Sequence, residues 1–130
     1  PMNFLDGTIE ADGDQLLFTA PAGVRLRITS EHAPLLHSYV GKSITLGVRP
    51  ELFTPEVDRE NEEKSVVIGN VDVVEPLGAE AYVYLSVGEA SITARLTGEQ
   101  LPRVDETCIL DVDMTKVRFF DAQTEQAIQG

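Results

Sequence analysis

The chain has 130 residues, of which 42% are hydrophobic, and 22 acidic against 10 basic residues give it a net charge of −12. This length predicts one domain, or two small barrels that share one core, burying roughly two thirds of the unfolded chain's surface. No apolar run approaches the ~18 residues of a membrane-spanning helix. Nucleic acid is disfavoured as a partner, because the net negative charge repels its phosphates and no basic cluster is longer than Arg25-Leu-Arg27.

The first half of the sequence predicts short strands joined by tight turns. Turn-forming residues at 11–14 and 21–23 separate segments that are rich in strand formers. Ser30 is placed to cap a short helix over residues 31–39, which Pro34 limits to its first turns. The predicted strands are Gly7–Glu10, Gln15–Ala20, Val24–Ile28 and Ser43–Val48.

The second half begins after an acidic stretch. Residues 54–65 hold five acidic, two basic and one apolar residue, so this segment cannot fold on apolar surface of its own and is expected to be a mobile connector. Residues 122–130 form a polar tail with weak helical character. Between them, the predicted strands are Val66–Glu75, Ala81–Val87, Ser91–Leu96, Thr107–Met114 and Lys116–Phe120.

The sequence contains an internal repeat. Residues 40–48 and 104–112 both read V-[GD]-[KE]-[ST]-x-x-L-x-V. A similar offset relates two pairs of glycines, Gly7 with Gly69 and Gly23 with Gly88. A unit of about 50 residues buries too little surface to be robust alone, so two copies should pair into one body.

These patterns predict an all-β fold of two OB-like small barrels from a duplicated β unit, with one or two short helices. The expected division is lobe one at about 4–53, the acidic connector at 54–65, lobe two at about 66–121 and the tail at 122–130. Exchange of strands between the lobes is compatible with this division.

Candidate chemical motifs are weak. Gly41-Lys-Ser43 resembles the end of a phosphate-binding loop, but Leu36 stands where that motif requires glycine, so a turn before a strand is the better interpretation. His32 and His37 are five residues apart, which separates them by about 140° on a helix and makes them poor co-ligands for a metal. No nucleophile motif is present, and we expect no catalysis, cofactor or metal.

Cys108 is the one cysteine of the chain. It cannot form an internal disulfide, so a reducing cytoplasm fits best, and we expect a buried structural thiol. The chain begins at Pro1 without a secretory signal, which suggests a cut made inside a longer protein.

Three segments and the end of the chain carry a family resemblance. The segments are Met2-Asn-Phe-Leu5, Leu46-Gly-Val-Arg-Pro-Glu51, Val71-Asp-Val-Val-Glu-Pro-Leu-Gly-Ala-Glu80 and the closing Arg118-Phe-Phe-Asp-Ala-Gln-Thr. In their order and spacing they resemble the C-terminal regulatory domain of the ATP-binding subunit of maltose- and glycerol-phosphate-type ABC sugar importers, over nearly all 130 residues.

The resemblance implies a pair of OB-like barrels, related to oxyanion-binding Mop-type modules, joined to a nucleotide-binding domain that would hold ATP and Mg. It implies no catalysis here: the sequence lacks a phosphate loop, an L-S-G-G-Q signature and an apolar strand that ends in Asp-Glu. The implied partners are a second copy, the subunit's own nucleotide-binding domain, the permease indirectly and a regulatory protein. The implied location is cytoplasmic, at the inner face of the plasma membrane.

The family's functional positions carry over only where residues match. Arg49, Pro50 and Glu51 match an R-P-E motif, although Leu52 replaces the histidine that often follows. The positions at which responsive family members dock regulators correspond to Gly41, Gly69 and Glu75. A structural interpretation stands beside each: the glycines, with Gly78, as turn residues with unusual backbone angles, and Arg49 with Glu51 as an ion pair.

Two other functions stay open. The Mop-like resemblance suggests a binding module for a small oxyanion such as molybdate, which would need convergent amides or cations against the charge of −12. An OB-type nucleic-acid binder ranks last, because the chain offers no basic groove beside its aromatic residues.

Overall fold

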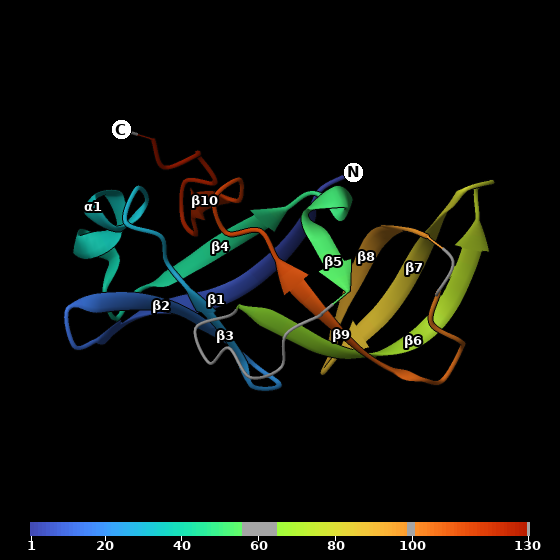
Figure 1. Cartoon of the computed structure of the whole chain (residues 1–130). Helices are drawn as coiled ribbons and strands as arrows, with labels where there is room; N and C mark the ends of the chain where they lie inside the picture. Colours follow the sequence, from blue (N-terminus) through green and yellow to red (C-terminus); the bar gives the residue numbers. More distant parts are fainter. Residues whose placement is uncertain (56–64, 99–100, 130) are drawn as a thin grey trace.

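The computed structural model describes residues 1–55, 65–98 and 101–129, which form ten strands in one curled sheet with one short α-helix and two 3-10 helices (Figure 1). In lobe one these are β1 (Asn3–Asp12), β2 (Gln15–Ala20), β3 (Val24–Arg27), α1 (Ala33–Leu36), η1 (His37–Tyr39) and β4 (Ser43–Val48). They are followed by η2 (Pro50–Leu52) and β5 (Phe53–Pro55). In lobe two they are β6 (Val66–Pro76), β7 (Glu80–Val87), β8 (Ala90–Thr97), β9 (Thr107–Val112) and β10 (Arg118–Asp121).

Each lobe is an antiparallel meander closed by a later strand. In lobe one, β1 pairs with β2, β2 with β3, and β4 returns to pair with the other edge of β1. In lobe two, β6 pairs with β7, β7 with β8, and β9 returns to β6. Glycines with positive φ, Gly23 at +76° and Gly88 at +61°, allow the tight hairpins. The all-β prediction of two OB-like units is confirmed.

The repeat seen in the sequence reappears as matching hydrogen bonds. Gly7 of β1 lies opposite Ile44 of β4, and Gly69 of β6 lies opposite Cys108 of β9. Before β4, the backbone N–H of Gly41 donates to the Ile9 carbonyl at 2.8 Å, and before β9 that of Asp105 donates to the Val71 carbonyl at 2.7 Å. Gly41 and Asp105 both have positive φ, so the two copies share even the strained turn that leads into the closing strand.

The last strand of each half pairs with the opposite lobe. β5 follows β4 in the chain but pairs with β9, and β10 follows β9 but pairs with β4. Figure 1 shows β5 lying beside lobe two and β10 beside lobe one. Neither lobe can close its sheet without a strand from the other, so the lobes form one body.

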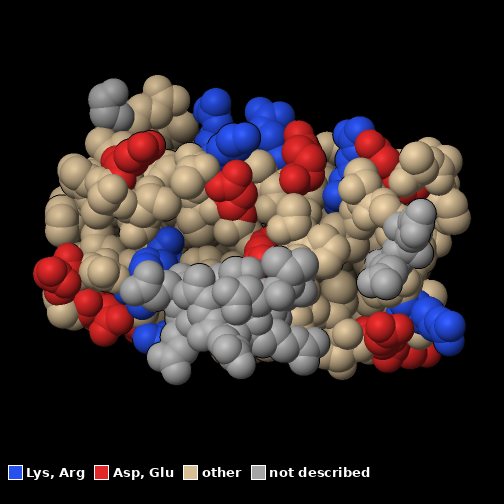
Figure 2. All heavy atoms as spheres, viewed as in Figure 1, with Lys and Arg blue, Asp and Glu red and all other residues tan. Residues whose placement is uncertain are grey.

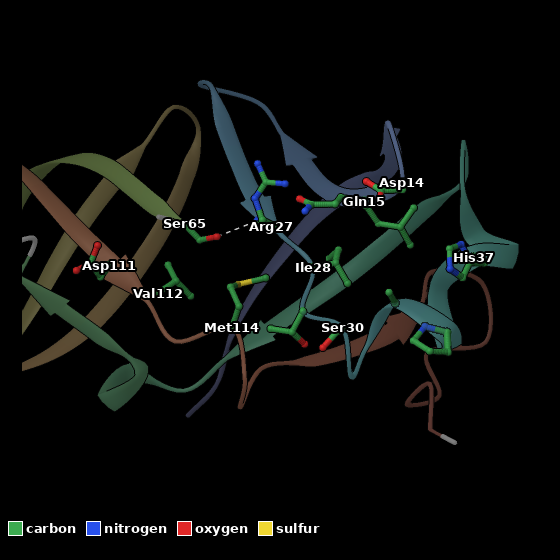
Figure 3. A pocket seen from close by; sticks show the side chains of 14 residues that line it. Asp14, Gln15, Arg27, Ile28, Ser30, His37, Ser65, Asp111, Val112 and Met114 are labelled. Atoms are coloured by element: carbon green, nitrogen blue, oxygen red, sulfur yellow. Dashed lines mark hydrogen bonds between the residues drawn. The ribbon is translucent and has the colours of Figure 1, made fainter. Parts of the chain in front are cut away.

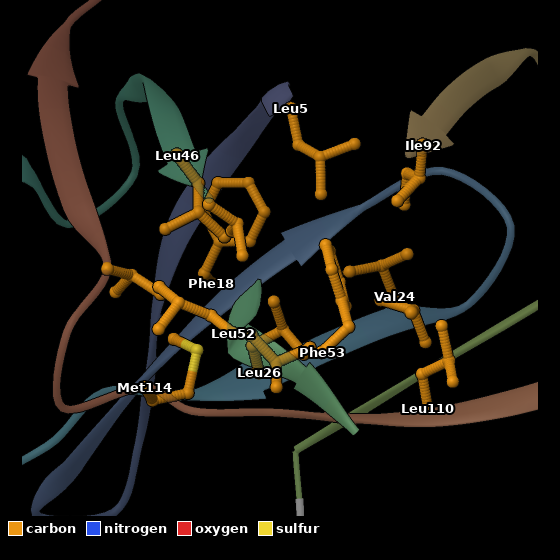
Figure 4. Packing of buried hydrophobic residues seen from close by; sticks show 14 of the residues in the cluster. Leu5, Phe18, Val24, Leu26, Leu46, Leu52, Phe53, Ile92, Leu110 and Met114 are labelled. Carbon is orange, nitrogen blue, oxygen red and sulfur yellow. The ribbon is translucent and has the colours of Figure 1, made fainter. Parts of the chain in front are cut away.

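The hydrophobic core runs through both lobes. Figure 4 shows side chains of the two lobes meeting around Phe53, among them Leu26 of β3, Ile92 of β8 and Leu110 of β9. Phe53 is 1% exposed, and burying a side chain of this size contributes roughly 1.5–3 kcal/mol. The exchanged strand β5 therefore supplies a central part of the shared core.

Two side chains also bind the lobes together at equivalent places. Asn3, at the start of β1, donates from Nδ2 to the carbonyls of Val48 (3.0 Å) and Thr93 (2.8 Å), and its Oδ1 accepts the Thr93 N–H at 2.7 Å. The carboxamide thus replaces a neighbouring strand for β8. In the other half, Ser65 Oγ accepts the backbone N–H of Arg27 in β3 at 2.8 Å.

Some local expectations were wrong. The helix begins at Ala33 and is four residues long, its N-cap is His32, and no side chain caps it, so Ser30 is not the cap. Thr29 takes part of that role, because its carbonyl accepts the backbone N–H of Ala33 at 2.9 Å. Residues 54 and 55 belong to β5, and residues 56–64 of the expected connector lie outside the described part.

The tail shows no helix in residues 122–129. Instead Ala127 forms an isolated antiparallel bridge with Phe120 of β10, and the N–H of Ile128 donates to the Phe119 carbonyl at 2.8 Å. Among the described residues, no helix is long and apolar enough to span a bilayer.

Candidate interaction surfaces

The R-P-E motif forms the turn that leads out of β4. Arg49 is exposed in extended backbone at the N-cap of η2, and its carbonyl accepts the Leu52 N–H at 3.0 Å. Pro50 is buried at the first position of this 3-10 turn, where its fixed φ suits the helix, and Glu51 is exposed. Pro50 therefore anchors the turn, while Arg49 and Glu51 are presented to the surroundings.

A shallow hollow of about 340 Å³ separates this turn from the edge of β8, lined among others by Glu51, Glu80 and Arg95. Among described residues, Arg95 pairs with Glu80, and no ion pair joins Arg49 to Glu51. The hydrogen bond from Arg95 holds the pKa of Glu80 below its ordinary value. The pKa of Arg95 is raised, mainly by Glu80 and also by the charge of Glu51. Glu51 thus faces Arg95 across the hollow.

The other three candidate residues lie apart from the motif and from one another. Gly41 is exposed at the start of β4, at one end of the molecule, and Glu75 is exposed near the end of β6, at the other end (Figure 1). Glu75 lies opposite Tyr82 on β7. Desolvation raises the pKa of Tyr84, and the nearby Glu75 carboxylate raises it further. The structure does not bring the six candidate residues together in one site.

The candidate glycines are required for different structural reasons. Gly41 and Gly78 have φ of +81° and +88°, as expected for turn residues. Gly69 has no positive φ and lies buried inside β6, so the turn interpretation was wrong for it. A Cβ at Gly69 would lie 2.8 Å from the Ser86 carbonyl oxygen and 3.0 Å from Val87 Cγ2. The residue permits the close approach of β6 and β7.

Both lobes line a groove of about 790 Å³, and no signal in the sequence predicts it. Figure 3 shows Asp14, Arg27 and His37 spread along it, with Asp111 and Met114 from lobe two. The two carboxylates stand against a single guanidinium, so the described lining gives an anion no net positive charge.

Among the described residues, no group of three or more His, Cys, Asp or Glu side chains gathers in one place. His32 packs edge-on against Phe119 with ring centroids 5.4 Å apart and contacts Thr29, which is a structural role. Cys108 is half-buried in β9, and desolvation raises the pKa of its thiol.

The charges are unevenly placed despite the acidic total. On the face seen in Figure 2, several Lys and Arg side chains lie along the upper edge, over β4, β10 and η2, with acidic side chains between them, and others lie at the lower left and lower right. On β1, which pairs with β4, Phe4 is 60% exposed although its neighbours Asn3 and Leu5 are buried. Sequence reasoning missed this side chain, because an aromatic residue in a strand is normally assigned to the core.

The comparisons with known proteins divide the chain as its two lobes do. Residues 1–53 match the MalK OB fold domain and residues 64–119 match the TOBE domain. The chain is similar over 98% of its length to three ATP-binding proteins. They are an uncharacterized ABC transporter protein YurJ of Bacillus subtilis (38% identical), the sulfoquinovosyl glycerol transport protein SmoE of Agrobacterium fabrum (34%) and the sn-glycerol-3-phosphate import protein UgpC of Salmonella typhimurium (31%).

The chain spans about a third of the length of these relatives, 33% to 35%. A solved structure with the same fold is the cytoplasmic molybdate-binding protein ModG with molybdate bound, at a TM-score of 0.71 and 20% identity, covering 90% of this chain and 94% of that one. The two domains occupy almost all of the chain, so the ATPase region is not among these residues. By its two domains and its relatives, the chain belongs to the OB-fold and TOBE domains of ABC transporter ATP-binding proteins.

Proposed function

We propose that this chain is the C-terminal regulatory and dimerisation part of a sugar-importer ATP-binding subunit. The observation that carries the proposal is the order of the two matched domains along the chain, together with relatives over 98% of its length that are ATP-binding transport proteins. ATP and Mg would bind in a nucleotide-binding domain outside these residues. The chain would act through protein contacts at the cytoplasmic face of the membrane.

The fold supports a mechanism based on contacts. Because β5 and β10 are exchanged and Asn3 joins the lobes, the two barrels move as one body. A rigid body attached to each ATPase domain can keep two subunits paired while the nucleotide domains open and close. A regulatory protein that binds one arrangement better than the other would shift the cycle by its difference in affinity.

The exposed candidate residues are the surfaces that we assign to such partners. Arg49 and Glu51 project from the η2 turn, and Gly41 and Glu75 lie at the two ends of the body. The separation of these places means that a partner at one of them leaves the others free. Pro50 and Gly69 support the surfaces from within, because both are buried.

The direct test of pairing is light scattering on the isolated chain across a concentration series. An interface below about 1,200 Å² would be weak without the rest of the subunit, so we expect dimers only at high micromolar to millimolar concentration. A monomer through the millimolar range would count against the proposal.

A second candidate is a module for a small oxyanion, favoured by the fold shared with molybdate-bound ModG. The likeness covers the fold alone, and Asp14 and Asp111 line the groove of about 790 Å³ together with Arg27. Calorimetry with molybdate, tungstate and sulfate separates the two functions. Saturable heat with molybdate supports the oxyanion module, and no heat with any of the three removes it.

A further inference from the structure

A hollow of about 440 Å³ lies on the outer face of β1, β4 and β10, three strands that are neighbours in the order β10-β4-β1. Thr45 of β4 lies opposite Asp6 of β1 on one side and Phe120 of β10 on the other, so these three residues form one row across the sheet. The turn that follows β10 adds Glu125 to the lining. We call this site the Phe4 hollow, lined by Phe4, Asp6, Thr45, Phe120, Asp121 and Glu125.

The apolar wall of the Phe4 hollow is an ordered pair of aromatic rings. The rings of Phe4 and Phe120 meet with centroids 5.7 Å apart and planes at 68°. Gly47 of β4, opposite Phe4, leaves room for them, because a Cβ there would collide with the Met2 sulfur and lie 2.8 Å from a ring carbon of Phe120. Phe4 is nevertheless 60% exposed, so the fold fixes the pair in place and leaves ring surface accessible to a ligand.

One of the three carboxylates in the lining is held by the protein itself. The carboxylate of Asp121 accepts the backbone N–H groups of Gln123 at 2.8 Å and Thr124 at 3.0 Å, and the hydroxyl of Tyr39 at 2.9 Å. These bonds hold the pKa of Asp121 below its ordinary value. Asp121 is therefore charged at neutral pH and adds to the negative field, while its oxygens are engaged.

The other two carboxylates keep oxygens for a further donor. Asp6 accepts the hydroxyl of Thr45 through Oδ1 at 2.9 Å, and in the described part of the chain no donor bonds its Oδ2. Glu125 is exposed, and none of the described residues donates to its carboxylate. Its φ is +62°, which is uncommon for glutamate, and its N–H donates to the Asp121 carbonyl at 2.8 Å. The turn thus holds Glu125 beside the rings in a conformation that this residue type rarely adopts.

These features select a cation that is larger than a metal ion. Among the described residues, no three His, Cys, Asp or Glu side chains are grouped closely enough to hold a metal. The faces of aromatic rings attract organic cations and cover their alkyl parts, and carboxylates bind N–H donors of opposite charge. A volume of about 440 Å³ is within the range of pockets for small molecules. Anions are repelled by the three carboxylates.

We propose that the Phe4 hollow binds a small organic cation with N–H donors, of the alkylammonium or alkylguanidinium class. The alkyl part lies against the rings of Phe4 and Phe120, and the N–H groups donate to Asp6 and Glu125. The charge of Asp121 strengthens the attraction without a direct bond. This site goes beyond the proposed function, because it takes a small molecule and does not depend on pairing of two copies.

A titration followed by NMR tests the site on the 130-residue chain, with n-butylammonium chloride as the probe. We expect saturable shifts of the backbone amides of Asp6, Thr45 and Glu125. The dissociation constant should be on the order of 1 mM, because ring contacts and exposed ion pairs are individually weak. 1-Butanol, which has the same alkyl chain without the charge, and calcium chloride, which has charge without the alkyl chain, should leave these amides unshifted.

Two variants separate the ring contact from the charge contact. Phe4→Leu keeps an apolar side chain but removes the aromatic face, and Glu125→Gln keeps the shape but removes the charge. Each should weaken binding of n-butylammonium about threefold or more. The matched control is Glu10→Gln, because Glu10 is an exposed carboxylate of β1 that does not line the hollow, and it should leave the affinity unchanged.

The outcomes decide the proposal whether or not two copies pair. Saturable shifts that 1-butanol does not reproduce, together with weaker binding in Phe4→Leu and Glu125→Gln, would support an organic-cation site. Equal affinity for 1-butanol would show an apolar patch only. Equal losses in Glu10→Gln and Glu125→Gln would show general attraction to an acidic protein. Either of these results, or the absence of saturable shifts through the millimolar range, would overturn the proposal.

Discussion

Replacing Asn3 by alanine should loosen the joint between the two lobes. The side chain is 9% exposed and makes three hydrogen bonds, of 3.0, 2.8 and 2.7 Å, to the backbone of Val48 and Thr93. Asn3→Ala removes all three and leaves the N–H and carbonyl of Thr93 in β8, and the carbonyl of Val48 in β4, with fewer partners. An unsatisfied buried group costs about 1–3 kcal/mol, so partial access of water brings the sum to about 2–4 kcal/mol.

The assay is urea unfolding followed by circular dichroism, with thermal unfolding beside it. A loss of this size lowers Tm by on the order of 10 °C for a chain of this length. The matched control is Asn70→Ala, because Asn70 also lies in a strand but is exposed and bonds its own neighbour Asp72 at 3.2 Å. We expect the control to cost less than about 1 kcal/mol.

The reasoning would be refuted if Asn3→Ala and Asn70→Ala destabilised the chain equally. Asn3→Asp adds a sharper comparison, because it keeps the shape and the acceptor for the Thr93 N–H but sets a carboxylate against two carbonyls. At neutral pH it should therefore be less stable than Asn3→Ala.

Three further predictions concern single positions. Gly7→Ala should lower the free energy of unfolding by about 3 kcal/mol and Gly69→Ala by about 1–2 kcal/mol, as measured by urea unfolding. The difference arises because a Cβ at Gly7 would lie 2.5 Å from Phe18, whereas a Cβ at Gly69 meets atoms at 2.8 Å and beyond. Equal losses would contradict this. Backbone N–H bonds hold the pKa of Asp121 below its ordinary value, so its stabilisation is present above the unfolded-state pKa and lost as pH falls through the folded-state pKa. The acid-side fall in urea midpoint should be smaller in Asp121→Asn, and an unchanged pH profile would disprove the role. Burial raises the pKa of Cys108, so its thiol should react with a disulfide reagent at pH 8 at least tenfold faster in the unfolded chain, and equal rates would exclude protection.

The duplicated architecture could be predicted from the sequence because the two copies repeat the same residue types at the same spacing. The V-x-x-x-x-x-L-x-V segments mark the closing strands β4 and β9, and Gly7 and Gly69 mark the equivalent positions that pair with them. These are patterns of residue type and spacing, which any strand must satisfy to bury one face.

The sequence pattern does not show which strands pair with each other. The propensity of Phe53 or of Phe119 for a strand is the same whether that strand closes its own lobe or the other, so the exchange of β5 and β10 needed the structure. Strand β5 was not predicted, because Pro50 and Pro55 disfavour a strand in this part of the sequence. Tertiary packing of Phe53 decides its conformation instead.

The partner roles of the candidate residues stay predictions. Arg49 and Glu51 are exposed, as contact with a partner requires, but Gly69 is buried within the sheet. Phe4 and Asn3 were quoted only as members of a motif. Their inverted placement, with the amide inside and the aromatic ring outside, arises because Asn3 satisfies backbone groups of β8 that no strand pairs.

The most direct test of the account is the pairing of the full-length ATP-binding subunit in the absence of nucleotide. Light scattering on the intact subunit and on a version that lacks these 130 residues would compare the two. We expect the intact subunit to stay dimeric without ATP and the shortened subunit to dissociate into monomers until ATP is added. A shortened subunit that remains dimeric without nucleotide would contradict it.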